Sequence, residues 1–220
     1  MSVMLLLKSV ADANVSSELC RLPPHYKFAQ DRRARRYVLR MGRRSGFEHL
    51  LCYCGESGKE IVRHTDKEKD AVGLPRRHLA KAYSRGGRLI IHHNHPQSMS
   101  LSPVDIQHLV ARQGLVEIFA HGHDHSWYWA TSGRRRDSLD MVKHGEIAFV
   151  KAAKRLRRQG VLLRDEWMPH LFNLALDHSG IIKYKFGLSP TLSADLAQVA
   201  PRDSLELLDC VKQAIRKERQ

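Results

Sequence analysis

A short apolar run that ends in a cluster of histidines constrains this chain more than any other feature of its sequence. Leu89–Ile91 has the character of a buried strand, and it leads directly into His92–Pro96, which reads HHNHP. Side chains of a strand alternate between the two faces of a sheet, so His93 and His95 share one face while His92 lies on the other. Imidazole rings therefore gather where a buried strand reaches the surface.

Asp105 follows His95 by ten residues and supplies a carboxylate that would complete a metal site. Two histidines and one aspartate suit zinc, and three protein ligands leave a fourth position open for water. This is the arrangement of a catalytic rather than a structural zinc site. His92 points away from this set, and we expect it to pack in the core or to support a ligand.

A simpler interpretation exists for the second half of this stretch. Ser102, Pro103 and Asp105 have the order of a helix start, with serine at the N-cap, proline at the first helical position and an acid in the first turn. Capping alone would explain all three residues. The histidines just upstream favour the metal site, because a helix start does not require imidazoles.

The order His-x-His-Pro, a short loop and then Ser-x-x-Asp resembles the signature of the JAMM (MPN-plus) metallopeptidases. The HNHP form at His93–Pro96 is most similar to bacterial, phage and RadC-like members. Six residues separate His95 from Ser102, whereas seven is the commoner spacing in the family. The resemblance implies that His93, His95 and Asp105 hold Zn²⁺, that Ser102 helps to stabilise the oxyanion, and that an upstream glutamate acts as general base.

Glu48 is the expected general base. It precedes His93 by 45 residues, which leaves room for a hairpin and a helix to fold back, and it resembles the glutamate that the family carries on its first core strand. The alternative is a strand residue that faces solvent. Glu56 and Glu60 lie in or after the turn and fit less well. The resemblance then implies a zinc-dependent hydrolase of a peptide or isopeptide bond, with ubiquitin or a ubiquitin-like modifier as the leading substrate class.

The patterns along the chain predict an α/β fold with a mixed sheet. The same order of elements is found in the JAMM fold, which implies a JAMM-like (cytidine-deaminase-like) core over residues 47–131. We expect a basic arm over residues 1–46, whose arginine-rich part is either a short helix or a segment that docks on the core or on a polyanion, and a mostly helical extension over residues 132–220. The expected strands cover residues 47–54, 59–64, 88–95, 115–121, 126–130 and 181–186, and the expected helices cover 76–85, 103–113, 137–159, 165–178 and 203–217.

The chain is strongly basic, with 37 Lys and Arg against 23 Asp and Glu and a formal net charge of +14. Such an excess attracts polyanions, so nucleic acid, an acidic protein or an acidic membrane surface are all allowed partners beside a polypeptide substrate. Taken singly, the arginine runs at residues 32–36 and 134–136 are typical of solvated faces. The non-enzyme alternative is a RadC-like module that binds nucleic acid, with steeply salt-dependent affinity.

A second histidine cluster, at His121, His123 and His125, supports a rival enzymatic interpretation. Gly122–His125 reads GHDH and resembles the last metal-binding motif of calcineurin-like metallophosphoesterases. The earlier motifs of that family are absent from the sequence. Glycine and Asp124 are also the residues expected in a hairpin turn, which is the simpler interpretation of this segment.

The cysteines show no metal-binding or disulfide pattern. Cys20, Cys52, Cys54 and Cys210 lack any CxxC spacing, so we expect reduced thiols of a cytosolic type of compartment. Residues 1–10 lack the features of a secretory signal, and no apolar run approaches the length of a membrane span. The sequence therefore predicts a soluble cytoplasmic protein.

Overall fold

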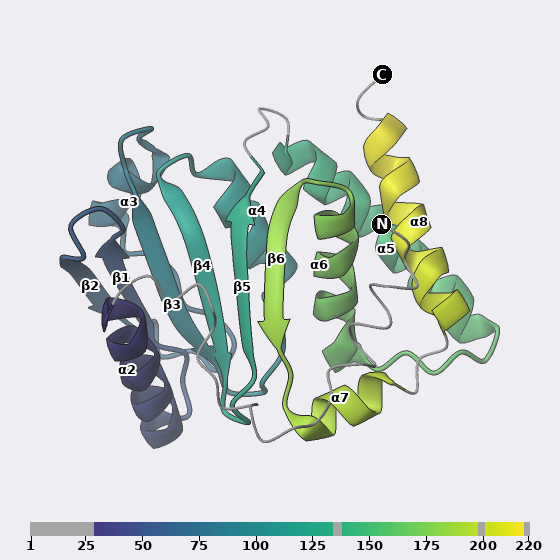
Figure 1. Ribbon diagram of the computed structural model, residues 1–220, viewed down its shortest axis with the longest axis horizontal. Helices are drawn as coiled ribbons and strands as arrows, with labels where there is room; N and C mark the ends of the chain where they lie inside the picture. The colour runs from purple at the N-terminus through teal and green to yellow at the C-terminus, as the bar shows by residue number, and fades with distance from the viewer. Residues whose placement is uncertain (1–28, 134–137, 198–200, 218–220) are drawn as a thin grey trace.

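A six-stranded mixed sheet organises the structure, a computed structural model that describes residues 29–133, 138–197 and 201–217 (Figure 1). The strands lie in the order β2-β1-β3-β4-β5-β6. They are β1 (Leu50–Cys54), β2 (Glu60–His64), β3 (Leu89–His95), β4 (Leu115–Gly122), β5 (Trp127–Ser132) and β6 (Ile182–Gly187). The helices are α2 (Ala29–Ser45), α3 (Arg76–Tyr83), α4 (Pro103–Ala111), α5 (Ser138–Arg158), α6 (Met168–His178), α7 (Pro190–Leu196) and α8 (Pro201–Lys217), with a short 3-10 helix at Asp165–Trp167.

One parallel pair lies at the centre of an otherwise antiparallel sheet. β3 and β4 run parallel, and α4 lies between them in the chain, as the crossover of a parallel pair requires. The pairs β1–β2, β1–β3, β4–β5 and β5–β6 are antiparallel. The predicted α/β class with a mixed sheet is therefore confirmed.

Most expected elements are present, with shifts at their ends. The first strand begins at Leu50 rather than Phe47, so Glu48 lies in the connection between α2 and β1. The helix α7 is not predicted by any pattern, because its seven residues are too few to show a period. β6 pairs with β5 and carries the sheet beyond residue 131. The division of the chain at residues 46 and 131 stays a prediction.

Three cysteines that the structure describes, Cys52, Cys54 and Cys210, are free thiols. Cys20, the arginine run at residues 134–136 and residues 1–28 of the expected arm lie outside the described residues. Among the described helices, none has the length and apolar character needed to cross a membrane.

The sheet separates two apolar layers. On one face, α2 packs over Ile90 of β3 and Phe119 of β4, and it lies at the lower left of the sheet in Figure 1. On the other face, Leu89 and Ile91 belong to a larger core that α4, α5, α6 and α8 complete. All seven residues of β3 are buried, so its alternating side chains must be accommodated in both layers.

The helix α2 is amphipathic, with an apolar stripe on the sheet and arginines outside. Ala34 and Val38 are fully buried against the sheet, as expected for positions separated by about one helical turn. Gly42 continues this stripe at the closest approach to β3, where a Cβ atom would overlap the amide of Asn94. Only glycine fits there without displacement of the helix or of the Asn94 side chain.

A polar cluster anchors α2 to the sheet from within this layer. The Asp31 carboxylate is buried, and its Oδ1 lies 3.1 Å from His92 Nε2. The hydroxyl of Tyr53 donates to the same oxygen. His92 Nδ1 is in turn 3.0 Å from His121 Nε2, and its ring stacks on Phe119. His92 thus lies on the face opposite His93 and His95, as the strand alternation predicts.

Removal of the Asp31 carboxylate is expected to loosen this helix. In Asp31→Ala, His92 and Tyr53 both lose the buried carboxylate that they contact, which costs about 3 kcal/mol of unfolding free energy. Denaturant titration followed by circular dichroism measures the loss. Arg32→Ala, the exposed neighbour on the same helix, is the control and should change the stability by less than about 0.5 kcal/mol. Equal stability of the two variants would contradict the anchoring role.

Candidate metal centre

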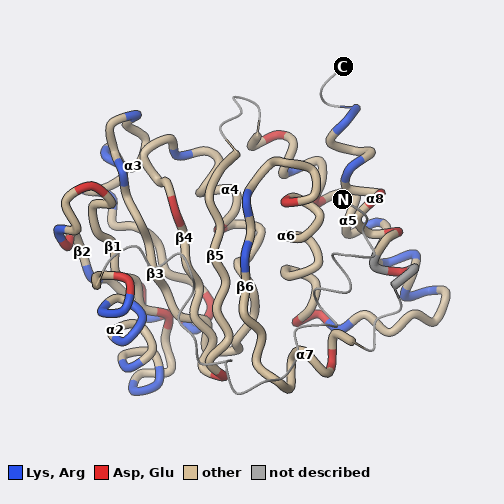
Figure 2. Tube along the Cα trace, in the orientation of Figure 1, with Lys and Arg blue, Asp and Glu red and all other residues tan. Residues whose placement is uncertain are grey.

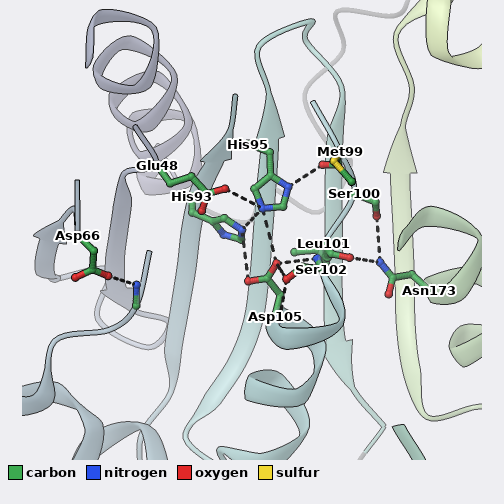
Figure 3. A network of polar contacts seen from close by, with 11 residues as sticks. Glu48, Asp66, His93, His95, Met99, Ser100, Leu101, Ser102, Asp105 and Asn173 are labelled. Atoms are coloured by element: carbon green, nitrogen blue, oxygen red, sulfur yellow. Dashed lines mark hydrogen bonds and ion pairs between the residues drawn. The ribbon is translucent and has the colours of Figure 1, made fainter. Parts of the chain in front are cut away.

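The residues that the sequence predicts for a metal site meet on one face of the sheet, at the end of β3 (Figure 3). His93 Nε2 lies 2.8 Å from His95 Nε2. Asp105 Oδ1 is 3.6 Å from His93 Nε2, and Asp105 Oδ2 is 3.7 Å from His95 Nε2. Glu48 Oε1 is 3.7 Å from His95 Nε2. Two imidazoles and two carboxylates therefore converge on one point.

Strand geometry and hydrogen bonds orient the two imidazole rings. His93 and His95 are two residues apart on β3 and so point to the same face. His95 Nδ1 donates to the carbonyl oxygen of Met99, 2.8 Å away, which leaves the lone pair of Nε2 directed at the centre. A backbone hydrogen bond with Phe119 holds the ring of His93. A metal-binding histidine usually makes such a hydrogen bond with the ring nitrogen that does not bind the metal.

Asp105 reaches the centre because of the helix start that the simpler interpretation predicts. Ser102 is the N-cap of α4, and its side chain and that of Asp105 form a capping box. Asp105 Oδ2 accepts from both the backbone N–H and the hydroxyl of Ser102, each at 2.8 Å, while Oδ1 faces His93. Capping and convergence on the histidines are thus two roles of the same carboxylate.

The register of the antiparallel pair β1–β3 explains the position of Glu48. Leu50 pairs with His93, so two residues further along the same register Glu48 lies opposite His95. Asn94, between the two histidines, holds this segment from the other face of β3. Its side chain accepts from the backbone N–H of His49 at 2.8 Å and donates to the carbonyl oxygen of Phe47 at 3.2 Å.

The donor atoms fit a small divalent cation. Glu48, His93 and His95 offer ligand atoms that all lie within 4.8 Å of one another, so this group could hold a metal ion. Ligands at the usual distances from tetrahedral zinc are roughly 3.3–3.6 Å apart. The separations of 3.6 and 3.7 Å between Asp105 and the two rings come close to this value, and only the two ring nitrogens, at 2.8 Å, would have to move apart.

The two carboxylates of the centre have pKa values shifted in opposite directions. Burial raises the pKa of Glu48 to about 7, although His93 opposes the shift. Burial alone would also raise the pKa of Asp105, but His93, His95 and the Ser102 hydroxyl outweigh it and hold this pKa below its ordinary value. Asp105 is therefore a permanent anion at neutral pH, whereas Glu48 can gain or lose a proton there.

The two imidazoles also differ. Burial and the neighbouring His93 lower the pKa of His95 to about 4, so its ring is neutral. Burial alone would lower the pKa of His93 as well, but the carboxylates of Asp105 and Glu48 outweigh it and raise this pKa. The centre thus favours one positive charge beside the carboxylates. Either a proton on His93 or a metal ion can supply this charge, so the two compete.

A cavity of about 550 Å³ opens from this centre to the outside. Ser102 and Asp105 line it together with Glu48 and His95. The rest of the lining comes from the connection between β2 and α3, from the loop before α4, from α4 itself and from the start of α6: Lys69, Asp70, Ala71, Val72, Gly73, Pro96, Gln97, Met99, Ser100, Val104, His108 and Pro169. Both carboxylates are therefore accessible from this cavity.

The C-terminal part of the chain supports the loop before α4, which sequence reasoning did not anticipate. Asn173 of α6 donates to the carbonyl oxygen of Leu101 at 2.8 Å and to Ser100 Oγ at 3.1 Å. Ser100 Oγ lies 2.6 Å from the hydroxyl of Tyr184 on β6, which His170 also contacts at 2.8 Å. These groups belong to segments far apart in the sequence, so no local pattern predicts their contacts. The one signal in the sequence is the amide of Asn173 within the apolar stripe of α6, because a buried amide needs hydrogen-bond partners.

The second histidine cluster does not form a metal site among the described residues. His121 is buried on the α2 face, where it contacts His92. His123 and His125 lie in the turn between β4 and β5, and arginines of α2 donate to their backbone carbonyls. Asp124 accepts hydrogen bonds within the same turn. The prediction of a hairpin turn at this segment is confirmed.

Comparisons with known proteins identify no relative from which a function could be inferred. No family model, curated protein or solved structure matches this chain.

Loss of the Asn173 amide is expected to destabilise the loop that leads to Ser102. In Asn173→Ala the buried carbonyl of Leu101 and the hydroxyl of Ser100 lose a donor, which lowers the free energy of unfolding by about 1–3 kcal/mol. Chemical denaturation measures the change. Gln159→Ala removes an amide from an exposed position after α5 and should stay within about 0.5 kcal/mol of the parent protein. An Asn173→Ala variant as stable as this control would show that the network does not hold the loop.

Proposed function

We propose that this chain is a zinc-dependent hydrolase of the JAMM type that cleaves a peptide or isopeptide bond. The observation that carries the proposal is the convergence of His93, His95 and Asp105 beside Glu48, at the base of a cavity. Three ligands and a separate acid–base group are what metal-assisted hydrolysis requires. The crossover from β3 to α4, which carries all three ligands, supports a JAMM-like core as well.

The protonation states decide between ligand and base for the two carboxylates. We assign Asp105 as the ligand, because its lowered pKa keeps it anionic and Ser102 fixes its orientation. We assign Glu48 as the general base, because burial raises its pKa to about 7, close to the pH at which it would act. The zinc ion, when bound, supplies the Lewis acidity that polarises the carbonyl and lowers the pKa of water.

The chain's own side chains would handle the proton and the developing charge. Glu48 accepts a proton from the attacking water and passes it to the leaving amine. Ser102 donates its only hydroxyl proton to Asp105 Oδ2 in this structure. Its role as oxyanion donor therefore requires the hydroxyl to rotate toward the substrate carbonyl, which lies in the same cavity that Ser102 lines.

The rival interpretations differ in support. A phosphoesterase would need a second set of ligands around the GHDH segment, and the described residues offer none. A polypeptide with a ubiquitin-like modifier is the substrate class that follows from the JAMM proposal. The free thiols Cys52, Cys54 and Cys210 are compatible with the cytoplasm, which stays a prediction.

Zinc content tests the ligand set. The double variant His93→Ala, His95→Ala removes both neutral ligands, so the purified protein should fall from about one zinc per chain to a background level. Metal analysis by mass spectrometry after dialysis gives the stoichiometry. His144→Ala, which removes an exposed imidazole from α5, should keep the full zinc content. Unchanged zinc in the double variant would remove the assignment.

Glu48→Gln separates a base from a ligand. The amide keeps the size of the side chain but cannot accept the proton, so cleavage of an isopeptide-linked di-ubiquitin probe should fall by about 10²–10⁴-fold while zinc content stays the same. Glu56→Gln, at an exposed turn, should leave both unchanged. Loss of zinc in Glu48→Gln would instead make Glu48 a ligand. Hydrolysis of a generic phosphodiester, with no cleavage of the isopeptide, would favour the phosphoesterase.

A further inference from the structure

The helix α2 concentrates positive charge on the side of the sheet away from the metal centre. Figure 2 shows basic positions in blue recurring along this helix, and in α2 all of them are arginines. Its one acidic residue, Asp31, is buried and turned toward His92. Six of its arginines are exposed, and a seventh, Arg35, is partly buried; the exposed ones are Arg32, Arg33, Arg36, Arg40, Arg43 and Arg44.

Part of this charge lines a groove between α2 and β2. Arg33, Arg36, Tyr37, Arg40 and Arg63 enclose a volume of about 500 Å³. The three helical arginines are three and four positions apart and so share one face of α2, over a length of about 10 Å. The guanidinium of Arg63 lies over the ring of Tyr37, 4.7 Å from its centroid, and this contact closes the β2 side of the groove.

Few carboxylates balance the groove. Glu60 is 2.8 Å from Arg63 and 3.9 Å from Arg33. Within the part of the chain that the structure describes, no ion pair involves Arg36 or Arg40. Four guanidinium groups thus face one carboxylate, and the low-dielectric wall of the helix strengthens their field.

We propose that this groove binds the phosphate backbone of nucleic acid. The planar guanidinium fork matches phosphate oxygens in a bidentate way. A row of such groups about 10 Å long fits a polymer with regularly spaced charges. The lining contains no apolar pocket that would anchor a side chain of an acidic peptide. Contacts of this kind, made to phosphates, carry no sequence information.

This site is separate from the proposed hydrolase centre. Arg63 pairs with Leu51, whose side chain lies in the α2 layer, whereas His93 and His95 point into the opposite layer. Nucleic-acid binding and zinc binding are hence expected to be lost by different substitutions. Each proposal can fail while the other stands.

The full-length chain offers a matched pair of variants for the test. The triple variant Arg33→Gln, Arg36→Gln, Arg40→Gln neutralises the groove. Its control is Lys151→Gln, Lys154→Gln, Arg158→Gln on α5, which removes the same charge from three exposed positions with the same helical spacing. Fluorescence anisotropy with a labelled 20-base-pair duplex and a 20-nucleotide single strand, at 50 and 200 mM salt, measures binding. Zinc content and the unfolding midpoint of each variant report on folding.

We expect the parent protein to bind the duplex more weakly as salt rises, and unrelated sequences to bind equally well. The groove variant should lose at least tenfold in affinity at 50 mM salt, and the slope of log K against log salt should become shallower by about 2.7, since about 0.9 is lost for each phosphate contact. The α5 control should stay within about twofold of the parent. If the triple variant does not fold, Arg36→Gln, Arg40→Gln should give the same direction with a slope change of about 1.8.

Three results would overturn the proposal. The first is no binding by the parent protein at 50 mM salt. The second is an equal loss of affinity in the groove variant and the α5 control, which would make binding a property of net charge alone. The third is displacement of the duplex by polyglutamate as effectively as by unlabelled DNA, which would identify an acidic protein as the ligand instead.

Discussion

Burial of polar side chains on both faces of β3 is the constraint on which this structure depends. The strand is covered on both sides, yet it carries three imidazoles and an amide among its seven residues. A buried polar group without a partner costs several kcal/mol, so each of these groups must be met by a partner from another element. Asp31 meets His92 in one layer, and Asp105 and Glu48 meet His93 and His95 in the other.

The same constraint shapes the chemistry of the centre. Two carboxylates flank the same pair of rings, but they differ in what else they contact. Asp105 accepts two hydrogen bonds from Ser102 and faces His93, and these interactions overcome the effect of burial on its pKa. Glu48 lacks such donors among the contacts described, so burial dominates and raises its pKa. Two neighbouring acids therefore differ in protonation at neutral pH because their environments differ.

The two sides of the sheet carry different features, the arginines of α2 on one side and the cavity of the metal centre on the other. Because Asp31 and the apolar stripe hold α2 on the sheet, its arginines are directed outward, toward β2 and solvent. On the opposite side, the C-terminal helices do more than extend the fold. Asn173 of α6 holds the loop that ends at Ser102, and Pro169 lines the cavity itself. A segment without a recognisable motif therefore contributes to the geometry of the site.

The sequence by itself determined the local features of this protein. Alternation along a strand is enough to place His93 and His95 on one face, and the order Ser-x-x-Asp is enough to predict the start of α4 with Asp105 turned back toward it. Only the tertiary structure decided which distant groups meet. The register of β1 against β3 brings Glu48 opposite His95. Contacts such as Asp31 with His92 and Asn173 with Leu101 join residues 61 and 72 positions apart. The physical reason is that strand register and helix docking depend on the apolar surface that whole elements bury together. A short stretch of sequence does not contain this information.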